Sequence, residues 1–154
     1  MNQKLLVGTA LPLLIAAVIV LGYQGLSSGN LQGEKDVAAV RAVLDAQAAA
    51  WNRGEIEGYM NGYERSEQTT FVSGDQLTRG WQTVFDRYKK NYDSREKMGT
   101  LAFSELEVKT LSEFYIMVTG RWQLTRAQDT PHGRFTLVFR RTLQGWRIIH
   151  DHTS

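Results

Sequence analysis

The chain has 154 residues, enough for one domain with a substantial core, and its 42% hydrophobic and 22% charged residues are typical of a globular protein. It contains no cysteine, which excludes disulfides, thiolate catalysis and zinc sites built on cysteine. The formal net charge is only +2 and no block of like charges occurs, so nucleic-acid binding is disfavoured.

The N-terminal segment differs in composition from the rest of the chain. Lys4 is its first charged side chain, and the run Leu5–Leu21 is almost wholly apolar. A charged start before an apolar stretch is typical of an export signal, and this stretch is long enough to serve as a membrane anchor instead. We therefore predict a signal peptide or N-terminal membrane anchor at residues 1–23. The protein is then exported, with a periplasmic or extracytoplasmic domain, anchored in the inner membrane by residues 5–23 if the segment is not cleaved. Residues 24–34, rich in Gly, Ser and Asn, are predicted to form a flexible linker.

Three helices are predicted next, at residues 36–53, 55–65 and 81–92. In each of them apolar or aromatic residues recur at steps of three and four, which places these residues on one side of a helix. Gly54 is a natural end for the first helix. A short strand is predicted at residues 69–73.

After Gly99 the apolar residues alternate, which is the pattern of strands with one buried face. Four strands joined by short turns are predicted, and the alternation slips near Ser104-Glu105, which predicts a β-bulge. Helices followed by an antiparallel meander indicate an α+β fold. Three helices packed on a long, curved sheet enclose a cone, and we predict that this domain occupies residues 35–154.

Large aromatic residues of the predicted helices and strands could line such a cone. Tyrosine and tryptophan combine an apolar body with a polar tip, which suits a ligand pocket, although residues at this spacing also simply fill a core. The aromatic candidates for ligand binding are Trp51, Tyr59, Tyr63, Phe71, Trp81, Tyr88 and Trp122.

The last ten residues, GWRIIHDHTS, contain two of the three histidines. Alternate residues of a regular strand share a face, so His150 and His152 are predicted on the side that Trp146 and Ile148 bury, with Asp151 pointing away. The two histidines are then pocket residues that contact a ligand or transfer protons, or else polar residues at the edge of the sheet. Two ligands are too few for a metal site, so none is predicted.

Arg79 precedes Gly80 at the predicted start of the third helix, where backbone N–H groups favour negative charge. It is a candidate for contact with an anionic group of a ligand, the alternative being a solvated surface arginine. Sequence motifs for nucleotide binding, zinc hydrolysis or a nucleophilic serine do not occur, and no cofactor is predicted.

Three stretches, VLDAQAAAWNRGEIEGYMNGY, FVSG…TRGW and GRWQL…GRFTLVFRRTLQGWRIIHDHTS, resemble the SnoaL-like branch of the nuclear transport factor 2-like superfamily. More narrowly, they resemble a bacterial family that is itself a domain of unknown function. The resemblance covers about residues 35–154 and implies a cone-shaped α+β fold, with three helices against a curved, antiparallel-rich sheet and a homodimer formed through the sheet. The superfamily contains isomerases, dehydratases, cyclases, hydrolases and a kinase oligomerisation domain, so the fold does not determine the activity.

The sequence therefore favours a domain that binds a small, partly apolar molecule in a cone-shaped pocket. An alternative is a proton-transfer enzyme of isomerase, dehydratase or cyclase type, with His150, Tyr59 and Tyr63 as acid–base candidates. The second alternative is a structural oligomerisation module. The expected partners are a small-molecule ligand and a second copy of the chain, with the membrane contacted only through the N-terminal segment and no nucleic acid bound.

Overall fold

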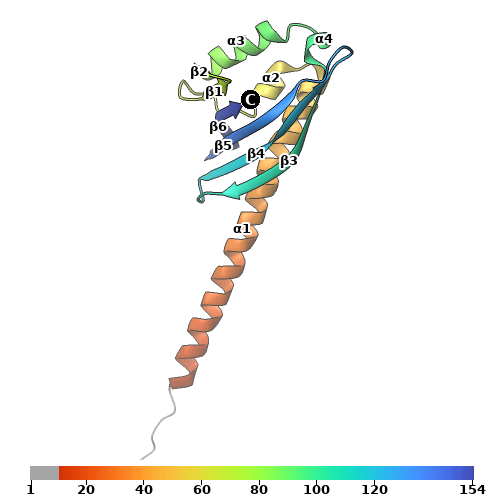
Figure 1. Cartoon of the computed structure of the whole chain (residues 1–154). Coiled ribbons are helices and arrows are strands. Elements are labelled where there is room, and N and C mark those ends of the chain that lie inside the picture. The colour runs from red at the N-terminus through yellow and green to blue at the C-terminus, as the bar shows by residue number, and fades with distance from the viewer. Residues whose placement is uncertain (1–10) are drawn as a thin grey trace, which may run out of the picture. The chain divides into compact units, whose positions relative to one another are not determined.

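The structure, a computed structural model, describes residues 11–154, with side chains from residue 29 onward (Figure 1). The chain divides into two compact units, and the second, Val37–Ser154, contains the whole sheet. The domain was predicted to begin at residue 35, next to this division. The predicted signal peptide or anchor at residues 1–23 lies outside the residues whose side chains are described. Within the described part of the chain, no helix is both long and apolar enough to cross a membrane.

The described chain consists of helices followed by strands, with a short hairpin between the helices. In chain order the elements are α1 (Leu11–Arg53), α2 (Ile56–Met60), β1 (Thr70–Ser73), β2 (Gln76–Arg79), α3 (Trp81–Asn91), α4 (Arg95–Met98), β3 (Thr100–Thr110), β4 (Tyr115–Thr125), β5 (His132–Thr142) and β6 (Gly145–Thr153).

The C-terminal end of α1 is fixed by a glycine and by an arginine from a distant helix. Gly54 has a φ of +85°, a conformation that glycine adopts without strain. Arg95 of α4 donates to the carbonyl oxygens of Trp51, at 2.8 Å, and Asn52, at 3.1 Å. The N–H of Gly54 also donates to the Trp51 oxygen, at 2.8 Å. The last carbonyls of a helix lack the usual N–H partner four residues on, and a positive charge beside them interacts favourably with the helix dipole. The predicted end at residue 53 is therefore confirmed.

Residues 24–34, for which we predicted a flexible linker, belong to α1 in the structure. Glycine lowers helix stability by about 1 kcal/mol relative to alanine, but it does not end a helix as proline does. Residues 24–34 contain no proline. Composition alone therefore overestimated the tendency of this segment to leave the helix.

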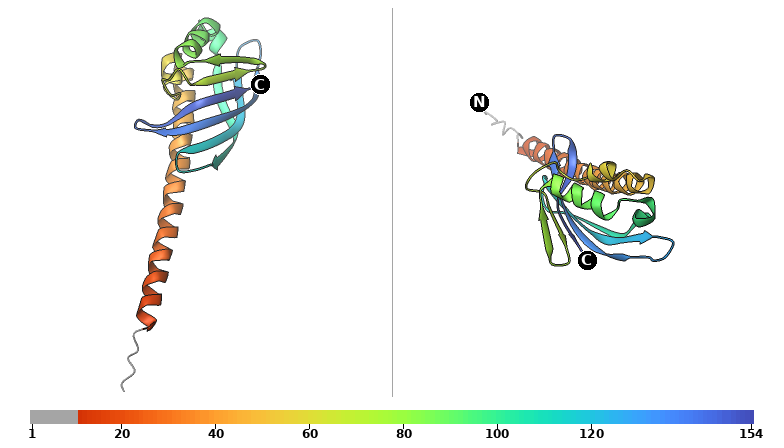
Figure 2. Two further views of the ribbon diagram at one scale, coloured as in Figure 1. Left: turned by 90° about the vertical axis from the view of Figure 1, so that its left-hand side faces the viewer. Right: turned by 90° about the horizontal axis from the view of Figure 1, so that it is seen from above.

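The six strands form one sheet in the order β2-β1-β6-β5-β4-β3. The strands β1 and β6 are parallel, and all other neighbours are antiparallel. The sheet is strongly curved, and α2, α3 and residues 37–53 of α1 cover its concave face (Figures 1 and 2). This arrangement confirms the predicted α+β class and the cone-type fold.

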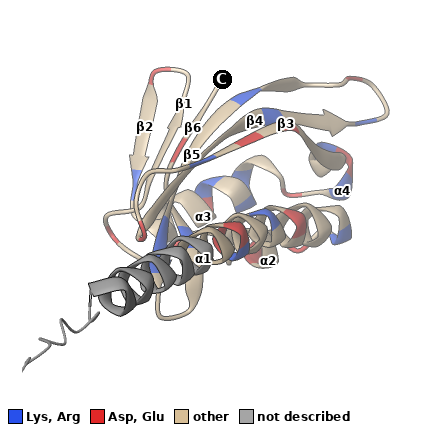
Figure 3. Ribbon diagram, turned by 90° about the horizontal axis from the view of Figure 1, so that it is seen from below, with Lys and Arg blue, Asp and Glu red and all other residues tan. Residues whose placement is uncertain are grey.

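The core lies between these two layers. Val40 and Leu44 of α1 and Ile116, Phe139 and Ile148 of the sheet have at most 1% of their surface exposed. Acidic and basic residues are interspersed along α1 and on the other elements (Figure 3). Surface ion pairs contribute at most about 1 kcal/mol each. Burial of apolar residues therefore provides most of the stability of the fold.

Two strands of the sheet contain an extra residue. In β3 the register shifts between Ser104 and Glu107, and Glu105 has a φ of +52°, which confirms the predicted bulge. In β6, Ile148 lies opposite Phe139 while His150 lies opposite Val138. Ile149 therefore has no partner on β5, and the residues after it face the opposite side from the one that strict alternation predicts.

Candidate functional site

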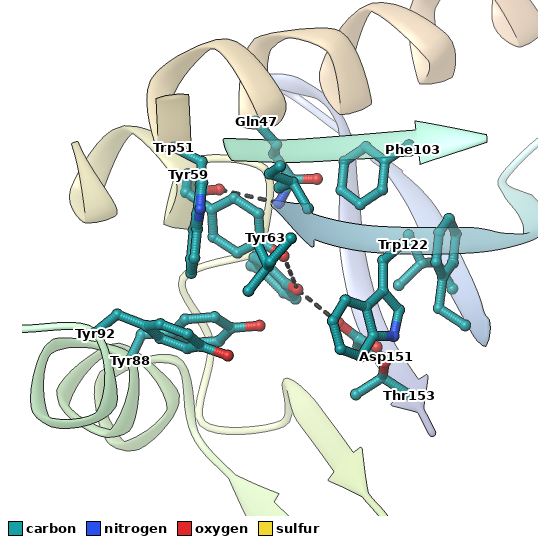
Figure 4. A pocket seen from close by; sticks show the side chains of 14 residues that line it. Gln47, Trp51, Tyr59, Tyr63, Tyr88, Tyr92, Phe103, Trp122, Asp151 and Thr153 are labelled. Atoms are coloured by element: carbon teal, nitrogen blue, oxygen red, sulfur yellow. Dashed lines mark hydrogen bonds between the residues drawn. The ribbon is translucent and has the colours of Figure 1, made fainter. Parts of the chain in front are cut away.

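A cavity of about 80 Å³ lies between the helices and the concave face of the sheet (Figure 4). This volume suits only a small ligand, because pockets for drug-sized ligands measure roughly 300–1,000 Å³. Leucine and phenylalanine side chains of the strands form part of its wall. Six residues with polar-tipped aromatic rings also line it, namely Trp51, Tyr59, Tyr63, Tyr88, Tyr92 and Trp122.

Asp151 of β6 is the charged residue of this cavity, and only 4% of its surface is exposed. Its Oδ2 atom accepts a hydrogen bond of 2.6 Å from the hydroxyl of Tyr63. Its Oδ1 atom is buried without a hydrogen-bond partner among the described residues. A buried carboxylate with an unsatisfied oxygen is costly, so a ligand that donates to Oδ1 would relieve an existing penalty.

The pKa of the Asp151 carboxyl group lies close to neutral pH. Burial raises the pKa of its carboxyl group to about 7, and the hydrogen bond from Tyr63 opposes part of this rise. A group with this pKa can both accept and release a proton at physiological pH.

The tyrosines next to Asp151 form a short chain of hydroxyl groups. The hydroxyl oxygens of Tyr59 and Tyr63 are 3.4 Å apart. Since the single hydroxyl proton of Tyr63 is donated to Asp151, Tyr59 is the donor to Tyr63. Burial, followed by the charge of Asp151, raises the pKa of both hydroxyls well above the ordinary value for tyrosine. Both therefore stay protonated and act as hydrogen-bond donors.

The position of Tyr63 is set by the backbone after α2. Tyr63 forms an isolated parallel bridge with Ile148 of β6. The N–H of Ile148 donates to the oxygen of Gly62, and the N–H of Glu64 donates to the oxygen of Ile148, both at 2.9 Å. The loop after α2 thus runs as an additional partner of β6, which brings Tyr63 close to Asp151.

Gly62 also allows α1 to approach this loop. A Cβ atom at Gly62 would lie 2.5 Å from the side-chain amide carbon of Gln47, so a larger residue would displace that side chain. The amide nitrogen of Gln47 donates to the backbone oxygen of Tyr59 at 3.0 Å. Gln47 has 2% of its surface exposed and lines the cavity.

The bulge at Ile149 overturns the predicted orientation of the last strand. Asp151 lies opposite Leu137 of β5, on the buried face, whereas His150 and His152 lie opposite Val138 and Thr136 on the other face. The prediction that Asp151 points away from the core is therefore wrong, and the two histidines do not line the cavity.

The contacts of the histidines agree with this placement. The Nδ1 atom of His150 lies 2.7 Å from the hydroxyl oxygen of Thr70, within hydrogen-bond distance, and His152 is exposed. Burial, and then the nearby His152, lowers the pKa of His150. His150 is thus a partly buried polar residue of the outer sheet face.

The structure places the remaining predicted site residues in two groups. Trp51, Tyr59, Tyr63, Tyr88 and Trp122 line the cavity, as predicted from the sequence. The other three, Phe71, Arg79 and Trp81, do not line it.

These three residues have other surroundings. The ring of Phe71 packs against that of Tyr88, with ring centres 5.7 Å apart, and so lies behind the cavity wall. Trp81 is buried, and its indole nitrogen donates to the oxygen of Met60 at 3.0 Å. Arg79 is exposed at the end of β2.

Sequence reasoning missed several residues of the site, and Asp151 is the most important of them. The available signal was the doublet Ile148-Ile149, because two consecutive apolar residues break the alternation of a strand with one buried face. Gln47, Tyr92 and Phe103 also line the cavity, and none of them was a candidate site residue in the sequence.

The described residues do not form a metal site. Within the part of the chain that the structure describes, no three side chains of the metal-ligating types His, Cys, Asp and Glu gather around one point. The polar groups that face the cavity belong to a single carboxyl, an amide, hydroxyls and indoles.

Comparisons with known proteins give a consistent result. The family model for SnoaL-like domains matches residues 40–154. A crystal structure of a nuclear transport factor 2-like protein of unknown function from Shewanella oneidensis is 40% identical, with a TM-score of 0.74. The match covers 77% of this chain and 98% of that one. No curated protein matches the sequence.

More distant structures share the fold alone. A domain of unknown function with a cystatin-like fold from Nostoc punctiforme is 20% identical, with a TM-score of 0.66 and coverage of 78% of this chain and 76% of that chain. A protein from Novosphingobium aromaticivorans, provisionally assigned as a scytalone dehydratase, is 9% identical. Its TM-score is 0.69, and the match covers 81% of this chain and 88% of that chain.

Proposed function

The chain belongs to the SnoaL-like domain family, and we propose that its cavity binds a small, partly apolar molecule. The observation that supports this most directly is the buried Oδ1 atom of Asp151, which has no hydrogen-bond partner among the described residues and belongs to a residue that lines an aromatic cavity. The rings offer apolar surface, and the carboxyl and hydroxyl groups fix the orientation of the bound molecule.

The four tryptophans of the chain provide a direct test. Trp51 and Trp122 line the cavity, while Trp81 and Trp146 do not. Phenol is a suitable probe because it is small, aromatic and able to donate to Asp151. In a phenol titration followed by NMR of the indole N–H groups, we expect saturable shifts at Trp51 and Trp122. Trp81 and Trp146 are the internal controls.

Two results of this titration would contradict the proposal. One is the absence of a saturable shift at Trp51 and Trp122 up to roughly 50 mM phenol. A dissociation constant above this concentration would be weak even for a fragment of this size. The other is an equal shift at all four indoles, which indicates non-specific binding or unfolding.

A second candidate function is supported by the protonation of Asp151. A carboxyl group with a pKa of about 7 in an apolar cavity is suited to move a proton to or from a bound molecule. In this version the acid–base group is Asp151, assisted by the hydroxyls of Tyr63 and Tyr59, in place of His150, which lies on the other face of the sheet.

Deuterium exchange at the α-carbon of cyclopentanone tests the second candidate without a known substrate. We expect the wild-type protein to accelerate this exchange and the Asp151→Asn variant to lose the acceleration. Asp75→Asn, which removes an exposed carboxyl in the turn between β1 and β2, is the matched control. Equal exchange rates for wild type and Asp151→Asn would refute proton transfer and leave binding intact.

The location and assembly of the protein also belong to the proposal. The apolar run at residues 5–23 supports export and anchoring in the inner membrane. The homodimer through the sheet stays a prediction that rests on the family resemblance. The intact mass of the exported protein tests the first point, and light scattering after gel filtration tests the second.

A further inference from the structure

We infer that the cavity takes a small alkylammonium cation, in which a positively charged nitrogen carries methyl or other alkyl groups. This inference rests on the proposed binding function and names the chemical class of the ligand. It follows from the charge of the cavity, the nature of its walls and its size.

The charge of the cavity has one sign. Among the described residues that line it, Asp151 is the acid, and no lysine, arginine or histidine is present. An anionic ligand would meet the carboxylate without a compensating cation, and a neutral ligand would leave the ionised carboxylate unpaired. A cationic ligand pairs the carboxylate inside a region of low dielectric, where charge pairing is strongest.

The walls are those of an aromatic cage. The centre of the Trp51 ring lies 5.2 Å from that of Tyr59 and 4.7 Å from that of Tyr92, and Tyr88 and Tyr92 stack at 5.7 Å. Trp122 lines the cavity from the sheet side (Figure 4). Aromatic faces attract cations, and cages of this kind recognise quaternary ammonium groups through this attraction. A hydroxyl on the alkyl group, as in choline, can also donate to the Oδ1 atom of Asp151.

Two arginines lie near enough to the cavity residue Tyr92 to affect its pKa, and each of them has a hydrogen-bond or ion-pair partner. Burial raises the pKa of Tyr92, and the guanidinium groups of Arg126 and Arg87 oppose part of this rise. Arg87 donates to Thr78 at 3.0 Å, and Arg126 pairs with Asp129 at 3.5 Å. Neither arginine lines the cavity, so neither neutralises Asp151 from within it.

The size of the cavity limits the cation. A volume of about 80 Å³ is well below the roughly 300–1,000 Å³ of pockets that hold drug-sized ligands. Tetramethylammonium and choline are among the smallest alkylammonium cations, whereas an ammonium group on a long acyl chain would have to leave most of that chain outside.

A matched pair of probes isolates the charge. Choline and 3,3-dimethyl-1-butanol have nearly the same shape, but the alcohol has carbon where choline has the charged nitrogen. Both are titrated into the full-length protein at pH 8, with the Trp51 and Trp122 indole signals as the readout. We expect choline to bind about tenfold more tightly than the alcohol, and the preference to vanish in Asp151→Asn. The Asp75→Asn variant should keep the preference for choline over the alcohol.

A second variant keeps the inference testable if Asp151→Asn does not fold. Tyr88→Leu removes one ring of the cage and leaves the carboxyl in place. We expect choline binding to weaken roughly tenfold in this variant and binding of the alcohol to weaken much less. An equal loss for both probes would contradict the aromatic cage.

The remaining outcomes separate this inference from the proposed function. If the alcohol binds as tightly as choline, or if phenol binds and choline does not, the cation inference is overturned and the binding function stands. If choline, the alcohol and phenol all fail to shift the two indoles, both are overturned.

Discussion

The hydroxyl of Tyr63 donates to the Oδ2 atom of Asp151 across 2.6 Å, although the two residues are 88 positions apart in the chain. Two local irregularities produce this contact. The loop after α2 pairs with Ile148, which places Tyr63 beside β6, and the bulge at Ile149 rotates Asp151 onto the same buried face. The result is a carboxyl group held at the wall of an aromatic cavity.

The Asp151→Asn variant should change how stability depends on pH. Below about pH 4 the carboxyl is protonated in both the folded and the unfolded chain. Between about pH 4 and pH 7 it ionises in the unfolded chain only, so the free energy of unfolding of the wild type falls as pH rises. The fall is on the order of 4 kcal/mol and is complete above pH 7. The Asp151→Asn variant does not show this fall in the free energy of unfolding.

Urea unfolding of both proteins between pH 4 and pH 8 measures this difference. The advantage of Asp151→Asn over the wild type should grow with pH, while Asp75→Asn should follow the wild type. Parallel curves for the wild type and Asp151→Asn would show that the Asp151 carboxyl is not shifted by burial.

Tyr63→Phe should destabilise the protein most where Asp151 is ionised. The variant keeps the ring but removes the donor to Oδ2, which leaves a buried carboxylate without its hydrogen bond. We expect a loss of about 1–3 kcal/mol in the free energy of unfolding at pH 8 and a smaller loss at pH 4. Tyr115→Phe, at a side chain that is 40% exposed, is the control. An equal loss at both pH values would contradict a charge-assisted bond.

The bulge in β6 can be tested by thiol labelling because the chain contains no cysteine. Single cysteines are introduced as Asp151→Cys, His152→Cys and Thr153→Cys. The thiol at position 152 should react roughly tenfold or more faster than that at position 151, since position 152 is exposed and position 151 is buried. The partly buried position 153 should be intermediate. The reverse order at positions 151 and 152 would indicate a strand without the bulge.

Trp81→Phe should affect stability but not the cavity. It removes the indole donor to Met60 and weakens the stacking of Arg65, whose guanidinium carbon lies 4.5 Å from the centre of the Trp81 ring. We expect a loss of about 1–2 kcal/mol in unfolding free energy. Phenol binding, followed at the Trp51 indole, should be unchanged. A large loss of phenol affinity in the folded variant would return Trp81 to the list of ligand-binding residues.

Periodicity predicted the parts of the fold in which one face is regularly buried. The three- and four-residue steps located α3, and the alternation around Ile116 and Val118 located β4. The hairpin strand β2 was missed because its four residues are mostly exposed and have no apolar period. The helix α4 has only four residues, which are too few to show an apolar period.

The site was harder to predict than the fold because it depends on register. Five cavity aromatics follow from helix and strand periodicity, since each belongs to an apolar stripe. Periodicity does not predict the face of the sheet on which Asp151 lies, because a single unpaired residue, Ile149, reverses the orientation of every residue after it in the strand. The slip in β3 was recognised from a run of polar residues, whereas the doublet Ile148-Ile149 stays apolar and was read as a continuous strand.

Asp151 is a buried carboxyl group of the cavity wall, and burial raises its pKa to about 7. NMR titration of the aspartate side-chain carboxyl carbons, in the wild type and in Asp151→Asn, measures this pKa. We predict one carboxyl signal with a midpoint of about pH 7 that disappears in the variant. If every aspartate titrates below about pH 5, near the ordinary value for this side chain, Asp151 is not a carboxyl group whose pKa is raised by burial.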